Sequence, residues 1–159
     1  GCTKLFHLAG PEGSWDALER KKGFLQACRD HGIDAEQIAI FQGDFHEPSG
    51  ERCAEHLLQF DELPHGLFAA NDMMAIGCMR VLQRSGIKIP HDIRIVGFDD
   101  NILASYVEPS LTTIRVPYDD IARVATEELV KQIEYPVRKT AKIRLEAELV
   151  VRQSCGTYI

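Results

Sequence analysis

Short apolar runs alternate four times with helical patterns in the first hundred residues. The clearest run is residues 67–70 (LFAA), which Asn71, Asp72 and a helical pattern as far as Leu82 follow at once. Apolar runs of this length, bounded by turn residues, predict buried strands. Three further strands are expected at residues 5–8, 38–41 and 93–98. Mostly apolar strands that alternate with helices predict an α/β fold, a doubly wound parallel sheet with helices on both faces.

Helix boundaries are expected where capping residues bracket the apolar periodicity. Asp16, with Glu19 three residues later, resembles a capping box and predicts a helix that runs to Asp30. A second helix is expected over residues 49–60, and Asp72 is expected to cap the third. The side chains expected to face the core from the first two helices are Leu18, Phe24, Leu25, Cys28, Cys53, Leu57 and Leu58.

The last fifty residues follow a different pattern. Residues 111–117 are expected to be extended, and Asp119 is expected to cap a helix that runs to Ile133. Residues 143–151 alternate between apolar and polar side chains, which predicts an edge strand with one buried face. The chain begins at Gly1 and enters a strand almost immediately, so we expect a fragment of a longer protein.

Composition argues against several classes of protein. The net charge is −6 and no basic stripe occurs, so this chain is not expected to bind nucleic acid itself. No apolar run approaches the roughly 20 residues of a membrane-spanning helix, and no secretory signal is present. The five cysteines lack CxxC spacing and the histidines lack HExxH spacing, so a metal site is not expected. Buried free thiols in a reducing compartment are expected instead of disulfides.

Polar or aromatic residues stand at corresponding points after the four predicted strands. Arg20 lies near the start of the helix after the first strand, and Phe45, Asn71 and Asp99 follow the second, third and fourth. Because the carboxyl ends of parallel strands share one edge, we expect these four side chains to converge. A guanidinium, a carboxamide, a carboxylate and a flat aromatic face suit a small polar ligand, such as a sugar or a heterocyclic base.

These positions also have purely structural explanations. Arg20 could pair with an acidic neighbour on its helix, and Phe45 could plug the edge of the core. Asn71 and Asp99 could simply shape turns. No nucleophile is paired with a base, and there is no phosphate-binding loop or GxGxxG motif, so neither enzymatic activity nor a cofactor is expected. A phosphoacceptor enzyme would need Mg²⁺ and a lysine beside the strand-end aspartates, and no lysine follows any strand.

Five motifs, in the same order along the chain, resemble those of the LacI/GalR family of bacterial transcription regulators. They are residues 20–24 (RKKGF), 69–77 (AANDMMAIG), 90–100 (PHDIRIVGFDD), 109–115 (PSLTTIR) and 148–154 (ELVVRQS). In the fourth motif, Ser110 replaces a second proline of the family pattern. Together the motifs span nearly the whole chain, so the resemblance covers more than one local feature.

The resemblance implies one lobe of a periplasmic-binding-protein-like two-lobe domain. Residues 1–111 would form the C-terminal lobe, 112–140 a crossover strand and helix that belong to the missing N-terminal lobe, and 141–159 a strand returning to the first. Arg20, Asn71 and Asp99 match the family's polar effector contacts, and Phe45 matches its aromatic position. Residues 10–16, with Ser14 and Asp16, match a further segment that lines the pocket.

The resemblance also implies partners. The effector would be a sugar, a sugar phosphate or a purine, and a helix-turn-helix outside this chain would bind DNA in the cytoplasm. Family members form homodimers through helices of this lobe, and the helix from Met73 is apolar on more than one face, which suggests a second covering surface or a plain core. The expected dimer contacts are Met73, Met74, Gly77, Cys78, Arg80 and Val81. The alternative function is a periplasmic sugar-binding protein of an ABC transporter, which shares the fold.

Overall fold

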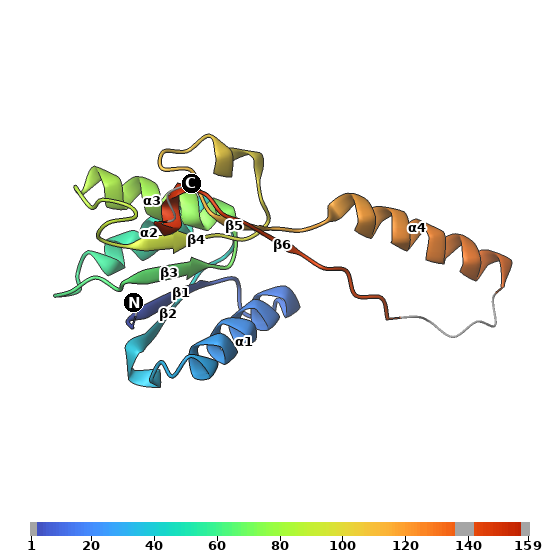
Figure 1. Cartoon of the computed structure of the whole chain (residues 1–159), viewed down its shortest axis with the longest axis horizontal. Coiled ribbons are helices and arrows are strands. Elements are labelled where there is room, and N and C mark those ends of the chain that lie inside the picture. Colours follow the sequence, from blue (N-terminus) through green and yellow to red (C-terminus); the bar gives the residue numbers. More distant parts are fainter. Residues whose placement is uncertain (1–2, 136–141, 157–159) are drawn as a thin grey trace.

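A parallel four-stranded sheet forms the body of the molecule (Figure 1). The computed structural model describes residues 3–135 and 142–156. The strands of the sheet lie in the order β2-β1-β3-β4. Their bounds are β1 Leu5–Ala9, β2 Ile38–Gln42, β3 Gly66–Ala69 and β4 Arg94–Val96. All three pairings are parallel, so the four carboxyl ends meet at one edge, as the sequence predicts.

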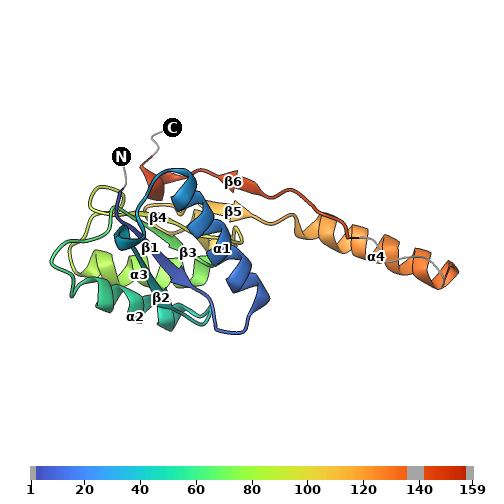
Figure 2. The same ribbon diagram turned by 90° about the horizontal axis from the view of Figure 1, so that it is seen from below.

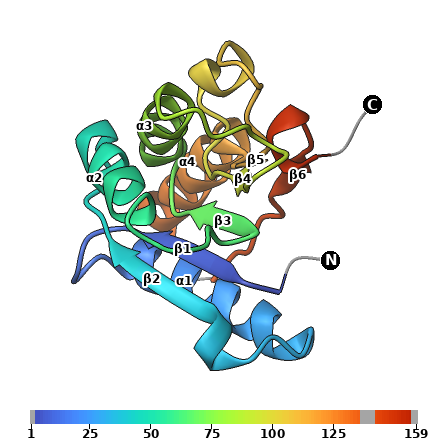
Figure 3. The same cartoon turned by 90° about the vertical axis from the view of Figure 1, so that its left-hand side faces the viewer.

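Helices cover both faces of this sheet, which confirms the predicted α/β class (Figure 3). Helix α1 lies on one face, and α2 and α3 lie side by side on the other. The helices of the body are α1 Trp15–Asp30, α2 Glu47–Leu57 and α3 Asp72–Arg84, with short 3-10 turns η1 Ala35–Gln37, η2 Ile102–Ser105 and η3 Gln153–Cys155.

Helices α2 and α3 approach each other closely because each carries a glycine at the contact. A Cβ atom on Gly50 would lie less than 3.0 Å from the Met74 carbonyl oxygen, and one on Gly77 equally close to that of Glu47. This contact buries Met74, Gly77 and Cys78 inside the chain. The prediction that these three form a dimer surface is therefore wrong, because α2 already covers that face of α3.

Three of the predicted helix caps are wrong by one or two residues. Ser14 accepts a hydrogen bond from the Ala17 amide and caps α1, whereas Asp16 lies in its first turn. Asn71, not Asp72, caps α3. Pro117 precedes α4, so Asp119 is in the first turn of that helix. Asp72 does not cap because its carboxylate turns inward to the Thr113 hydroxyl, 2.6 Å away.

The buried faces of α1 and α2 agree only in part with expectation. Cys28, Cys53 and Leu57 are buried, and Phe24 and Leu25 are half-buried. Leu18 and Leu58 are exposed, at 48% and 38%, so their assignment to the core is wrong. Helix α1 instead turns the small Ala17 toward the sheet, and α2 ends at Leu57, before Leu58 can complete another inward turn. Cys28, Cys53 and Cys78 are buried free thiols, as predicted, whereas Cys2 lies outside the described residues.

The chain leaves the body after β4 and later returns to it. Strands β5 Thr113–Arg115 and β6 Glu148–Val150 pair antiparallel, and between them α4 Tyr118–Glu134 extends away from the body (Figures 1 and 2). No residue of α4 is buried. Of the alternating run 143–151, only 148–150 form a strand, because the preceding residues have no neighbouring strand. The expected boundary between residues 140 and 141 involves residues outside the described ranges.

Candidate functional site

The four residues predicted from the strand ends lie together at the carboxyl edge of the sheet. Arg20 Nη2 lies 3.4 Å from Asp99 Oδ1, and the Arg20 guanidinium carbon lies 5.6 Å from the centre of the Phe45 ring. Asn71 Nδ2 donates a hydrogen bond of 2.8 Å to the Phe45 carbonyl oxygen. Elements that are far apart in the sequence therefore bring all four positions to one site.

Arg20 is held from several sides. Its guanidinium stacks on the Phe98 ring at 3.9 Å, and Nη1 donates to the carbonyl oxygen of Ala70 at the end of β3. The ion pair considered for Arg20 on its own helix is absent, since Glu19 pairs with Lys22 at 2.8 Å. Cation–π contact and a charged partner fix the guanidinium in place while its edge stays partly accessible.

Asn71 performs the structural role considered for it. Its backbone is extended, and its side-chain oxygen accepts a hydrogen bond of 3.0 Å from the Met74 amide, which caps α3. With the bond to Phe45, this uses the oxygen and one of the two amide hydrogens. A carboxamide has two N–H donors, so Asn71 keeps one for a further partner.

Asp99 joins the body of the molecule to the first turn of α4. Its Oδ1 accepts from Arg20 and from the Tyr118 hydroxyl, each at 3.4 Å. Burial raises the pKa of the Asp99 carboxyl, and the Arg20 charge partly offsets this. The neighbouring Asp72 is more buried, which raises its pKa to about 6 although Thr113 and Asn101 donate to it.

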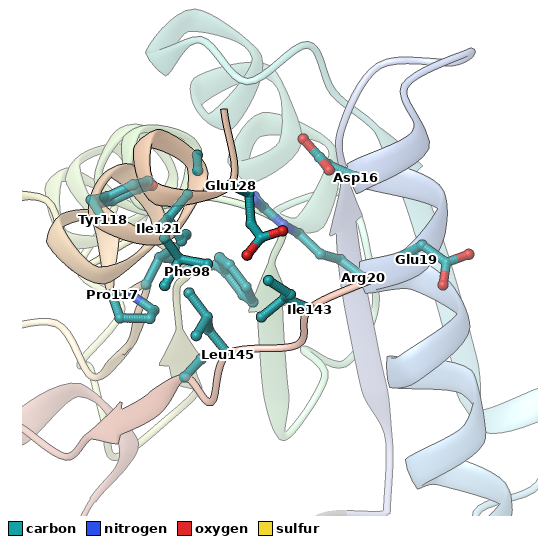
Figure 4. Close-up of a pocket in the computed structure, with 14 residues that line it drawn as sticks. Asp16, Glu19, Arg20, Phe98, Pro117, Tyr118, Ile121, Glu128, Ile143 and Leu145 are labelled. Carbon is teal, nitrogen blue, oxygen red and sulfur yellow. The ribbon is translucent and has the colours of Figure 1, made fainter. Parts of the chain in front are cut away.

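A cavity of about 770 Å³ opens between α1, the end of β4 and α4 (Figure 4). Arg20, Phe98 and Tyr118 point into it from three elements, and Glu128 approaches from α4. Its apolar wall includes Pro117, Ile121, Ile143 and Leu145. Asp16 also lines it, as the sequence suggested, whereas Ser14 is the cap of α1.

The four predicted site residues do not all line the same cavity. Asp99 borders a second cavity of about 580 Å³, which shares residues 116–118 with the first. Neither cavity includes Phe45 or Asn71 in its lining. Sequence reasoning missed Phe98 and Tyr118. Phe98 is the last residue of the strand predicted over 93–98, and its position directly before Asp99 is the one signal in the sequence that places it near the site. Tyr118 follows the crossover strand, where the pattern gave no sign of contact with Asp99.

Comparison with known proteins identifies the family. The periplasmic binding protein-like domain family matches residues 1–155. The chain belongs to that family. Within it, this LacI-type domain is 33% identical to the ribose operon repressor of Halalkalibacterium halodurans over 156 residues, which are 97% of this chain and 46% of that protein. The chain thus spans about half the length of the curated relatives it matches.

Solved structures agree with the identification of a LacI-type domain. A LacI family transcriptional regulator from Enterococcus faecium with bound ribose superposes with a TM-score of 0.87 and 28% identity, over 97% of this chain and 57% of the other. A lac repressor dimer bound to operator and an anti-inducer gives a TM-score of 0.89 and 30% identity, over 97% and 53%. The resemblance seen in the five sequence motifs is therefore confirmed.

Neither a cluster of metal-binding side chains nor a membrane-spanning helix is found in the described ranges 3–135 and 142–156. No group of three or more His, Cys, Asp and Glu side chains there could hold a metal ion. No helix within these ranges is long and apolar enough to cross a membrane.

Proposed function

We propose that this LacI-type domain senses a small metabolite, without catalysis, for a cytoplasmic transcription regulator. The observation that carries the proposal is the convergence of Arg20, Phe45, Asn71 and Asp99 at one edge of the sheet. Both partners of the Arg20–Asp99 pair are partly accessible, with side-chain exposures of 18% and 29%. A ligand with hydroxyl groups can therefore replace part of this pairing without opening the core.

The chemistry favours a sugar. Arg20 donates and Asp99 accepts, which matches the paired donor and acceptor character of neighbouring hydroxyl groups, and Phe98 provides an apolar ring face nearby. A relative is named for the ribose operon, and a similar solved structure contains ribose. A pentose is thus the first candidate. A sugar phosphate or a purine would use the same polar groups and is the second.

A second lobe is expected to complete the site. Helix α4 has exposed apolar side chains, including Ile121, Leu129 and Ile133, and the 770 Å³ cavity is open between α4 and the body. We infer that the crossover 112–140 belongs to an N-terminal lobe that covers this face. A helix-turn-helix outside the chain would then bind DNA.

The alternative, a periplasmic sugar-binding protein of an ABC transporter, is less well supported. The relatives are named as repressors, and the chain keeps buried free thiols at Cys28, Cys53 and Cys78. Free thiols are typical of a reducing compartment. Both observations favour the regulator.

Isothermal titration calorimetry on the intact protein that contains this chain tests the proposal. The probes are D-ribose, D-ribose 5-phosphate and hypoxanthine, one for each ligand class, with the open-chain polyol ribitol as a control. We expect one probe to bind in the micromolar range, which corresponds to about 8 kcal/mol, and ribitol to bind much more weakly. Absence of binding by all three probes would contradict this sensing function.

A further inference from the structure

Two consecutive residues at the end of β4 have a backbone conformation that side chains disfavour. Asp99 has φ 113° and Asp100 has φ 53°, and neither is glycine. Non-glycine residues keep such values only where the surrounding structure holds them. The carboxylate that faces the proposed ligand therefore depends on whatever restrains this pair of residues.

The Asp100 carboxylate makes two strong contacts that can provide the restraint. Its Oδ1 accepts from Arg152 Nη2 and its Oδ2 from Arg115 Nε, each at 2.6 Å, and its side chain is only 11% exposed. Arg152 is fixed in turn, because its Nη1 donates to the Leu111 carbonyl oxygen at 2.8 Å. Although burial opposes it, these hydrogen bonds hold the pKa of Asp100 below its usual value, so the contacts stay charged.

Backbone hydrogen bonds also join residues 99 and 100 to β5, the strand that contains Arg115. The Asp99 amide donates to the Ile114 carbonyl oxygen at 2.8 Å, and the Asp100 amide donates to the Thr113 hydroxyl at 3.3 Å. Asp99 is thus anchored at its backbone, and its carboxylate is free to point toward Arg20 and Tyr118.

We propose that Asp100 is a positioning residue for the ligand site: through Arg115 and Arg152 it keeps residues 99 and 100 in the left-handed conformation that directs the Asp99 carboxylate at Arg20. The consequence for ligand binding rests on the proposed function, but the positioning itself does not. The two arginines stand just before α4 and just after β6, so the same carboxylate also links the site to both ends of the crossover.

The test measures the pKa of the Asp99 carboxyl by NMR in the intact, carbon-13-labelled protein. Arg152→Met is the informative variant because two explanations predict changes of opposite sign in the pKa of Asp99. Loss of a cation alone would raise the pKa of Asp99. Loss of positioning would expose the carboxylate and lower its pKa toward the ordinary aspartate value, and this is the expected result.

Arg123→Met is the matched control, since Arg123 is also paired with two carboxylates, Asp120 at 2.8 Å and Glu127 at 3.2 Å, but on the exposed part of α4. It should leave the pKa of Asp99 unchanged. A pKa of Asp99 that rises or stays constant in a cooperatively folded Arg152→Met variant overturns the proposal, as does a fall of the same size in the control.

A pair of variants at residue 100 covers the case in which Arg152→Met fails to fold. Glycine adopts positive φ freely, so Asp100→Gly should preserve the raised pKa of Asp99 better than Asp100→Ala. If Asp100 acted only as a structural ion-pair partner, Asp100→Gly would preserve the raised pKa of Asp99 no better than Asp100→Ala. Failure of all three probes to bind would contradict the proposed function and would leave these pKa measurements valid.

Discussion

The Asp99 carboxylate makes two long polar contacts within the site. Arg20 contacts Asp99, and Asp99 also accepts from Tyr118, with both distances at 3.4 Å. These distances are longer than typical charge-assisted hydrogen bonds, so a hydroxyl group that fits between them gains rather than loses contacts.

Asp99→Ala should weaken binding of the effector roughly 10- to 100-fold, because a hydrogen bond to a charged group contributes about 1.5–3 kcal/mol. Calorimetry on the intact protein, with the probe that binds the wild type, measures the change. Glu127→Gln, which removes an exposed carboxylate on α4, should bind like the wild type. Asn71→Ala is the poorer test, because it also removes the cap of α3. Equal affinities of wild type and Asp99→Ala would exclude Asp99 from the site.

Asp72 gives a prediction about pH. Burial raises its pKa in the folded state to about 6, from an ordinary value of 3.8, so the folded protein binds this proton more tightly than the unfolded chain. The corresponding stabilisation is complete below the ordinary pKa and is lost as the pH rises to about 6. Its size is roughly 3 kcal/mol. The free energy of unfolding of the wild type, relative to Asp72→Asn, should therefore fall between pH 4 and pH 7.

Urea denaturation at several pH values measures this difference. Above about pH 7 the two curves should run parallel, because Asp72 is then ionised in both states of the wild type. A difference between wild type and variant that stays constant from pH 4 to pH 7 would mean that the folded structure does not raise the pKa of Asp72.

At the scale of elements, the contact between α2 and α3 decides which surfaces remain free. The two glycines at this contact admit no side chain, and the closeness they allow seals one whole face of α3. An apolar helix pattern shows how many faces need covering but not which neighbour covers them.

Gly77→Ala and Gly50→Ala should each lower the free energy of unfolding by about 1–3 kcal/mol or more, because the added methyl group meets backbone atoms of the other helix. Gly23→Ala in α1 is the matched control, since a Cβ there meets nothing within 4 Å. It should stabilise the protein by about 0.5–1 kcal/mol, the usual gain in a helix interior. Urea denaturation compares the three, and a harmless Gly77→Ala would contradict the tight contact.

At the scale of the whole molecule, the remaining exposed apolar surface suggests where a second copy binds. Of the predicted dimer residues, Met73, Arg80 and Val81 keep accessible surface. Ile102 in the nearby 3-10 turn η2 is 72% exposed, and Tyr106, directly after the turn, is 77% exposed. Gln83 of α3 donates to the Glu108 carbonyl oxygen in the segment that follows η2. The homodimer contact predicted on α3 would therefore lie on this face, which a symmetric dimer would pair with the same face of a second copy.

Val81→Asp combined with Tyr106→Asp should shift the intact protein from dimer to monomer, because two charges would be buried at the interface. Sedimentation velocity across a range of concentrations measures the shift. Leu18→Asp, on the exposed face of α1, is the control and should leave the oligomeric state unchanged. A double variant that sediments like the wild type would remove η2 and α3 from the proposed interface.

Sequence alone determined the order of strands and helices, the parallel sheet and the convergence of residues 20, 45, 71 and 99. These follow from local periodicity and from one topological rule, that parallel strands end at a common edge. The caps of α1 and α3 were misplaced by two residues and one residue because neighbouring polar residues have similar capping ability, and only the backbone geometry selects among them.

Only the tertiary structure decided what each side chain contacts. It turned Asp72 inward, stacked Arg20 on Phe98, brought Tyr118 to Asp99, and gave Asp100 two arginines that lie 15 and 52 residues further along the chain. It also placed α2 over the supposed dimer face of α3. Such contacts form between elements that are far apart in the sequence and close in space. A pattern within one segment carries no information about which other segment lies beside it.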